Sequence, residues 1–137
     1  MDPVIIEPGT EGLGEMLGGL VRANIERAPQ RMELLRPPIS RVNVRASDME
    51  ASVGILMGAG RFRVQPEVLP APDLDISAGG ETLLALTAVP LRLGMPDVAT
   101  AEGRTILGKL ARGELRVQGM LTRMPLLMRL NRLLSAL

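Results

Sequence analysis

The chain has 137 residues, of which 46 % are hydrophobic and 23 % are charged, and its formal net charge is +1. This length and composition predict one globular domain, and the small net charge provides no broad field that would attract nucleic acid. The sequence contains no His and no Cys, which excludes Ser-His-Asp triads, thiolate nucleophiles, disulfide bonds and thiolate zinc sites.

The N-terminal part of the chain predicts an arm followed by two helices. Residues 1–9 are apolar but hold two prolines, which favours an arm docked on the body through its aliphatic side chains. We expect a first helix over residues 10–28, capped by Thr10 and carrying one apolar stripe. Its glycines each weaken it by ~1 kcal/mol, which indicates a close backbone approach or a mobile element. A short second helix is expected over residues 30–36.

Further along the chain, several segments have the pattern of β-strands. Residues 40–47, 50–57 and 61–65 alternate between apolar and polar side chains and predict an antiparallel meander with one apolar face. Residues 73–77 and 114–118 predict a fourth and a fifth strand. Because a sheet with one apolar face needs a partner layer, we expect helices to cover that face.

Helical patterns dominate the second half of the chain. Residues 81–88 and 102–111 predict compact helices, separated by an irregular apolar segment at 91–96 and a short helix over 96–100. The last helix is predicted from Pro125 nearly to the C-terminus. Its leucines fall within one narrow arc of the helical wheel, and arginines lie opposite.

Several polar groups are candidates for a catalytic, metal, phosphate or nucleic-acid site. Asp73 and Asp75 share the outer face of their strand, and we interpret them as a solvated strand edge rather than an acid–base pair or a divalent-ion site. Residues 9–19 are rich in glycine but lack the spacing of a phosphate-binding loop. A basic strand face is interrupted by acidic residues and has no aromatic platform for bases, so we interpret it as solvated. Its arginines are Arg41, Arg45, Arg61 and Arg63.

These observations leave little room for catalysis. A Ser-Lys arrangement would need Lys109, the single lysine, and no Ser-x-x-Lys spacing exists. We therefore predict no enzyme, no catalytic residue, no metal site, no cofactor and no nucleic-acid partner. The longest apolar runs are far shorter than the ~20 residues of a membrane span, and no signal-peptide pattern opens the chain. We expect a cytoplasmic protein.

The surplus in this sequence is aliphatic. Phe62 is the only aromatic residue and there are nine methionines, which serve either as core filler or as the lining of an adaptable pocket. The second half offers more apolar helix than five strands need, which favours a cavity between the sheet and these helices, although core packing explains the same residues. The predicted lining comprises Ile55, Met57, Leu83, Leu86, Leu93, Met95, Val98, Ile106, Leu107, Leu110, Met120, Met124 and Leu127.

Two segments carry a family resemblance. Residues 73–86 (DLDISAGGETLLAL) and 113–134 (GELRVQGMLTRMPLLMRLNRLL) resemble the sterol-carrier-protein-type (SCP2-like) lipid-binding family, with its Asp-led strand, Leu-rich helix, Gly-x-Leu-x-Val-x-Gly strand and amphipathic last helix. The resemblance spans about residues 13–136. It implies an α+β fold in which a five-stranded, mainly antiparallel sheet is covered on one face by helices, with an apolar tunnel between them. We therefore expect one such domain over residues 10–137, preceded by the arm.

The segment 91–104 (LRLGMPDVATAEGR) is longer than in the sterol-carrier members and is similar to bacterial relatives. Some of these relatives are accessory proteins that hold prenylated quinone precursors for other enzymes. The scarcity of aromatic residues also removes the ring-on-ring contacts that a sterol pocket could use.

The leading hypothesis is non-catalytic binding or transfer of an apolar ligand, such as a sterol, a fatty acyl group or another lipid. The alternatives are an accessory protein for prenylated quinone precursors and an interaction module that docks the closing helix on a partner or on a second copy of the chain. The same helix could also contact a membrane surface transiently, with Arg123, Arg129 and Arg132 reaching anionic head groups.

Overall fold

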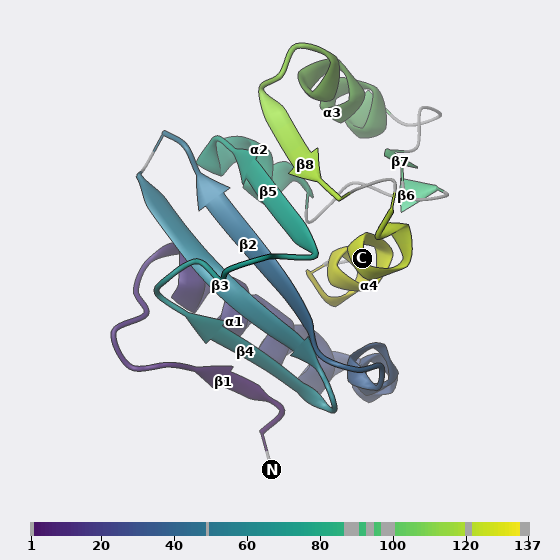
Figure 1. The fold of residues 1–137 in the computed structure, drawn as a ribbon. Coiled ribbons are helices and arrows are strands. Elements are labelled where there is room, and N and C mark those ends of the chain that lie inside the picture. The colour runs from purple at the N-terminus through teal and green to yellow at the C-terminus, as the bar shows by residue number, and fades with distance from the viewer. Residues whose placement is uncertain are drawn as a thin grey trace.

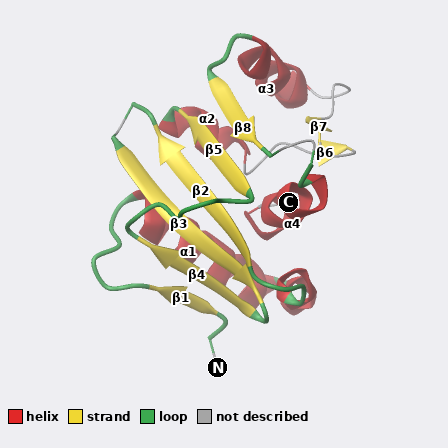
Figure 2. Cartoon of the chain, viewed as in Figure 1, coloured by secondary structure: helices red, strands yellow, loops and turns green. Residues whose placement is uncertain are grey.

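The computed structural model describes residues 2–48, 50–86, 91–92, 95–96, 101–119 and 122–134. Within this part of the chain, a six-stranded sheet is packed against helices (Figure 1). Helix α1 crosses behind the sheet, and α4 lies beside the β2–β5 end, as the colouring by secondary structure also shows (Figure 2). The α+β class predicted from the sequence is confirmed.

The sheet has the strand order β1-β4-β3-β2-β5-β8 and is mixed rather than mainly antiparallel. Strand β1 pairs with β4 in parallel, β2 pairs with β5 in parallel, and the other neighbours are antiparallel. The expectation of a five-stranded, mainly antiparallel sheet was therefore wrong. The strands are β1 (Val4–Ile6), β2 (Ser40–Ala46), β3 (Ala51–Gly58), β4 (Arg61–Gln65), β5 (Leu74–Ala78) and β8 (Leu115–Gln118).

The additional strand comes from the predicted arm. The Phe62 N–H donates to the Pro3 carbonyl at 2.9 Å, and the Glu7 N–H donates to the Val64 carbonyl at 2.9 Å. These bonds satisfy the edge of β4, which would otherwise present unpaired backbone groups. An apolar arm too short for a hairpin of its own thus becomes a parallel edge strand.

Most of the predicted helices are confirmed, with shifted ends. The second helix is a 3-10 helix rather than an α-helix, and the segment at 91–96 forms a short hairpin, while residues 97–100 of the predicted 96–100 helix lie outside the described residues. The helical elements are α1 (Leu13–Arg27), η1 (Pro29–Leu35), α2 (Gly80–Leu86), α3 (Ala101–Ala111) and α4 (Met124–Leu134). The hairpin consists of β6 (Leu91–Arg92) and β7 (Met95–Pro96).

The expected cap of the first helix was wrong. The N-cap of α1 is Gly12, whose φ of 55° lies in the left-handed region that glycine adopts easily, and no side chain caps the helix. Thr10 is buried, and its Oγ1 has no hydrogen-bond partner in the described part of the chain. Thr10 lies two residues before the N-cap, in the turn that follows β1, where its N–H donates to the Glu7 carbonyl at 3.1 Å.

Two glycines let α1 approach the sheet closely. A Cβ atom at Gly18 would lie 2.7 Å from Ile6 Cγ1. One at Gly14 would collide with the Thr10 methyl group and would lie 3.1 Å from Val53 Cγ1 and 3.2 Å from Val64 Cγ1. A Cβ at Gly19 would have no described neighbour within 4 Å. The predicted close backbone approach is therefore confirmed at Gly14 and Gly18, where any larger side chain would push the helix off the strands.

The last helix is held by the core. Its residues Leu126, Leu130 and Leu133 are buried in the same apolar cluster as the sheet. The buried Asn24 of α1 donates from Nδ2 to the Leu133 carbonyl at 2.9 Å, which satisfies one of the carbonyls that the last turn of a helix leaves unpaired. The leucine arc thus joins α4 to α1 and η1 within one molecule.

We predict that Gly19→Ala stabilises the chain and that Gly18→Ala does not. Gly19→Ala should raise the free energy of unfolding by about 0.5–1 kcal/mol, because alanine restricts the unfolded chain more than glycine does. Gly18→Ala has the same gain in helix propensity, but its added methyl group would collide with Ile6. The free energy of unfolding of Gly18→Ala should therefore be at least ~1 kcal/mol lower than that of Gly19→Ala. Urea unfolding measures both, and an equal gain in the two variants would contradict the close approach.

We further predict that Asn24→Ala lowers the free energy of unfolding by about 1–3 kcal/mol, because the Leu133 carbonyl is left buried and unpaired. Glu26→Ala, at an exposed position of the same helix, serves as the control and should change stability by less than ~0.5 kcal/mol. Similar losses in the two variants would show that the bond to α4 contributes nothing.

Candidate functional site

The structure describes the side chains of some of the residues predicted to line an apolar cavity. Ile55 and Met57 of β3 are 0 % exposed, and Leu83 of α2 is 7 % exposed. All three belong to the close-packed apolar core. Met124 and Leu127, in the first turns of α4, are half-buried. Of these five residues, Met124 and Leu127 on α4 keep exposed surface that a ligand could cover. The lining role of all five stays a prediction.

The other predicted lining residues are placed by their backbone alone. Leu86 ends α2, and Met95 lies on β7. Residues Ile106, Leu107 and Leu110 lie on α3, which contacts α2, β7 and β8. The fold therefore brings the segments that carry these residues to one end of the sheet. The predicted positions Leu93, Val98 and Met120 lie outside the described residues.

Sequence reasoning missed two half-buried aliphatic residues as candidates for the lining. Val117 of β8 and Leu134 of α4 pack against the core, as does Leu127 of α4, which was predicted. Val117 pairs with Ile76 on the core-facing side of the sheet. Its alternation with Leu115 was the available signal, because residues two apart in a strand share a face. We call Val117, Leu127 and Leu134 the half-buried aliphatic set.

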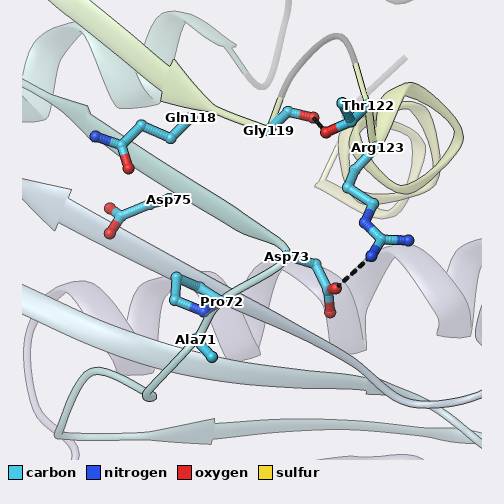
Figure 3. Close-up of a pocket in the computed structure, with 8 residues that line it drawn as sticks. All are labelled: Ala71, Pro72, Asp73, Asp75, Gln118, Gly119, Thr122 and Arg123. Atoms are coloured by element: carbon cyan, nitrogen blue, oxygen red, sulfur yellow. Dashed lines mark hydrogen bonds and ion pairs between the residues drawn. The ribbon is translucent and has the colours of Figure 1, made fainter.

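A polar groove of about 410 Å³ lies where β5 and β8 meet the start of α4 (Figure 3). The Asp73 carboxylate accepts the Arg41 N–H at 2.9 Å and forms an ion pair with Arg123 at 3.5 Å. Gly119, at a φ of 90°, lies so close to the Asp73 carbonyl that a Cβ there would collide with it. The groove is lined by Ala71, Pro72, Asp73, Asp75, Gln118, Gly119, Thr122 and Arg123.

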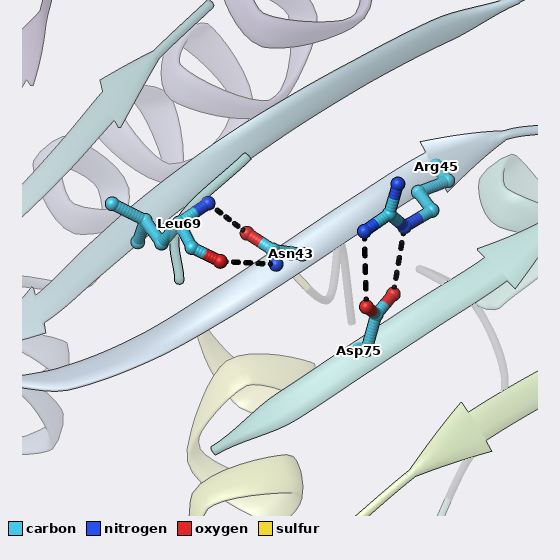
Figure 4. A network of polar contacts seen from close by, with 4 residues as sticks. All are labelled: Asn43, Arg45, Leu69 and Asp75. Carbon is cyan, nitrogen blue, oxygen red and sulfur yellow. Dashed lines mark hydrogen bonds and ion pairs between the residues drawn. The ribbon is translucent and has the colours of Figure 1, made fainter. Parts of the chain in front are cut away.

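The carboxylate pair singled out in the sequence is held by arginines. Asp75 accepts two hydrogen bonds from Arg45, at 3.1 and 3.2 Å (Figure 4). The hydrogen bond to Asp75, followed by its negative charge, raises the pKa of the Arg45 guanidinium, against a smaller effect of burial. The interpretation as a strand edge was wrong, because β5 lies between β2 and β8. No group of three potential metal ligands occurs among the described residues.

The outer face of the sheet is also covered by a loop. The buried side chain of Asn43 donates to the Leu69 carbonyl at 2.9 Å and accepts the Leu69 N–H at 2.7 Å (Figure 4). Gly54 makes room for this loop, since a Cβ there would lie 2.5 Å from the Glu67 carbonyl oxygen. The loop carries the chain from β4 across the sheet to β5, and this crossing is why β5 pairs with β2 in parallel.

The expected basic face is therefore mostly paired with acidic groups or backbone. Arg45 binds Asp75, Arg63 binds Glu7 at 3.3 Å, and Arg41 donates to the Pro70 carbonyl at 3.1 Å. Arg41 and Arg61 are exposed, whereas Arg45 and Arg63 are half-buried. Among the helices that the structure describes, none combines the length and apolarity that crossing a bilayer requires.

This arrangement of sheet and helices is an SCP2-like α+β fold. The ubiquinone synthesis protein UbiJ-SCP2 superposes with a TM-score of 0.55 at 17 % identity, over 85 % of this chain and 90 % of that one. The sec-alkylsulfatase Pisa1 from Pseudomonas sp. has a TM-score of 0.54 at 11 % identity, over 84 % of this chain but 16 % of the enzyme. At these identities the matches show the fold. No protein-family model and no curated protein matches the sequence.

A looser match is the sterol carrier protein domain 2 of Helicoverpa armigera, with a TM-score of 0.49 at 20 % identity over 92 % of each chain. The likeness of fold is carried by the superpositions on UbiJ-SCP2 and Pisa1, which have TM-scores above 0.5. The resemblance found in the sequence is thus confirmed as a likeness of fold.

We predict that Asn43→Ala lowers the free energy of unfolding by about 1–3 kcal/mol, because both backbone groups of Leu69 lose their partner. Arg45→Gln breaks the neighbouring ion pair with Asp75, which is partly exposed, and should cost less than ~1 kcal/mol. Urea unfolding of the two variants compares them directly. A larger loss for Arg45→Gln would mean that the ion pair, rather than the loop contact, organises this face.

Proposed function

We propose that residues 10–137, together with β1, form a single SCP2-like domain that binds or transfers an apolar ligand without transforming it. The observation that carries the proposal is the half-buried aliphatic set, Val117 of β8 with Leu127 and Leu134 of α4. Side chains that pack on the core yet keep exposed surface suit a ligand site, because covering them removes apolar area from water.

The chemistry of the lining favours an acyl or prenyl chain over a ring system. Phe62, the single aromatic residue, is 0 % exposed and lies on β4 in the core. A ligand therefore meets aliphatic side chains, which offer dispersion contacts but no stacking. Flexible methionines at positions 124 and 128 of α4 suit a chain of variable shape.

A second candidate is an accessory role in which the domain holds prenylated quinone precursors for other enzymes. Its support is the likeness of fold to UbiJ-SCP2, a protein of ubiquinone synthesis. A prenyl tail is apolar like an acyl chain and needs the same aliphatic contacts. Both candidate functions therefore use the half-buried aliphatic set. In either role the domain is not an enzyme, because the sequence has neither His nor Cys for the commonest acid–base and nucleophilic chemistry.

An interaction module built on the leucine arc has less support. Leu126, Leu130 and Leu133 are core residues, so the arc offers a protein partner or a second copy little surface. Transient membrane contact through the arginines of this helix stays a prediction. Arg132 is exposed, while Arg129 donates to the Leu34 carbonyl at 3.4 Å.

We expect native mass spectrometry of the purified chain to show a lipid as added mass, and a neutral fluorescent acyl probe to bind. Val117→Thr keeps the shape of valine but places a hydroxyl in the apolar site, so probe affinity should fall about threefold to tenfold. Arg116→Thr, at the adjacent exposed position, should leave it unchanged.

The two candidates are separated by competition between palmitoyl and polyprenyl-quinone ligands for that probe. Preference for the polyprenyl compound supports the accessory role, and preference for the acyl compound supports a general carrier. A chain that carries no lipid and binds no probe would overturn the proposed function altogether.

A further inference from the structure

The polar groove at the start of α4 holds a cation that is weakly engaged. The Arg123 side chain is 59 % exposed, and within the described residues its ion pair is with Asp73 at 3.5 Å. A guanidinium carries five N–H donors in a planar fork, so one carboxylate at this distance leaves several of them to solvent. An exposed pair of this kind contributes little to stability.

The acidic residues of the groove are already satisfied. Asp75 is held by two hydrogen bonds from Arg45, and Asp73 accepts the Arg41 N–H at 2.9 Å. The charge of Asp75 is offset by Arg45 on β2. The Arg41 group bonded to Asp73 is its uncharged backbone N–H, so the charge of Asp73 is paired with Arg123. Thr122 and Gln118 add exposed polar groups to the same groove (Figure 3).

This groove and the proposed apolar site involve the same two segments of the chain. On β8, Gln118 lines the groove on the outer face of the sheet, and its neighbour Val117 faces the core and belongs to the half-buried aliphatic set. Likewise, Leu127 of that set lies one helical turn after Arg123, with its N–H donating to the Arg123 carbonyl at 3.1 Å. Since β8 is the last strand of the described sheet, polar and apolar surfaces meet around its end.

We propose that the groove binds the acidic head group of an amphipathic ligand, a carboxylate or a phosphate, with Arg123 as the anchoring cation. This inference rests on the proposed function, because the ligand's tail would cover Val117 and Leu127. A volume of about 410 Å³ suits a head group rather than a whole lipid. The guanidinium fork matches both kinds of oxyanion, which accept paired N–H bonds.

The test measures how well palmitic acid, its methyl ester and lysophosphatidic acid displace a neutral fluorescent alkyl probe from the full chain. The acids should bind about tenfold more tightly than the ester, because a charged head group gains charge-assisted hydrogen bonds. Arg123→Gln should remove this preference and leave ester binding unchanged. Arg132→Gln, at an exposed position of the same helix, should alter neither. Inorganic phosphate alone, which lacks a tail, should not displace the probe.

If Arg123→Gln removes the preference over the ester only for palmitic acid, the head group is a carboxylate. If it removes the preference only for lysophosphatidic acid, the head group is a phosphate. A second measurement avoids any variant: added salt should weaken binding of the acids to the unaltered chain but not binding of the ester. Equal affinities for acids and ester, or a preference that survives Arg123→Gln, would overturn the head-group site while the carrier function stands. Failure of all three compounds to bind would instead overturn the proposed function.

Discussion

The contact between α1 and the β1-β4-β3 half of the sheet is the constraint on which the other packing depends. Gly14 and Gly18 place the helix backbone directly against Val53, Val64 and Ile6. The aliphatic face of α1 is thereby buried in the same core as Phe62, the single aromatic residue. The strand β1 is part of the same contact, because Ile6 fills the space that a side chain at Gly18 would occupy.

From α1 the core extends to the last helix and then to the candidate site. Asn24 ties the end of α4 to α1, and Arg129 ties its middle to η1. Three leucines of α4 are buried in the core, whereas Leu127 and Leu134 pack against the core and stay half-buried. The position of the proposed ligand site thus follows from which face of α4 the core has taken.

The two faces of the sheet divide the chemistry. The core-facing side is aliphatic, whereas the outer side is a network in which arginines neutralise aspartates and Asn43 fixes the covering loop. Ion pairs of this exposure add little stability, but they pair Arg45 with Asp75 and Arg63 with Glu7. Arg123 is more loosely held, by an ion pair with Asp73 at 3.5 Å, and its side chain is 59 % exposed.

The sequence by itself determined the α+β class, most helices and strands, the aliphatic core and the lack of His- or Cys-based chemistry, because these follow from periodicity and composition. It did not reveal that the arm is a strand, that β5 pairs with β2 in parallel, or that Gly12 rather than Thr10 caps α1. Only the tertiary structure decided these points, since strand pairing depends on contacts between distant segments. For the same reason, only the tertiary structure showed that Val117 and Leu134 are half-buried while Ile55 and Met57 are fully buried in the core.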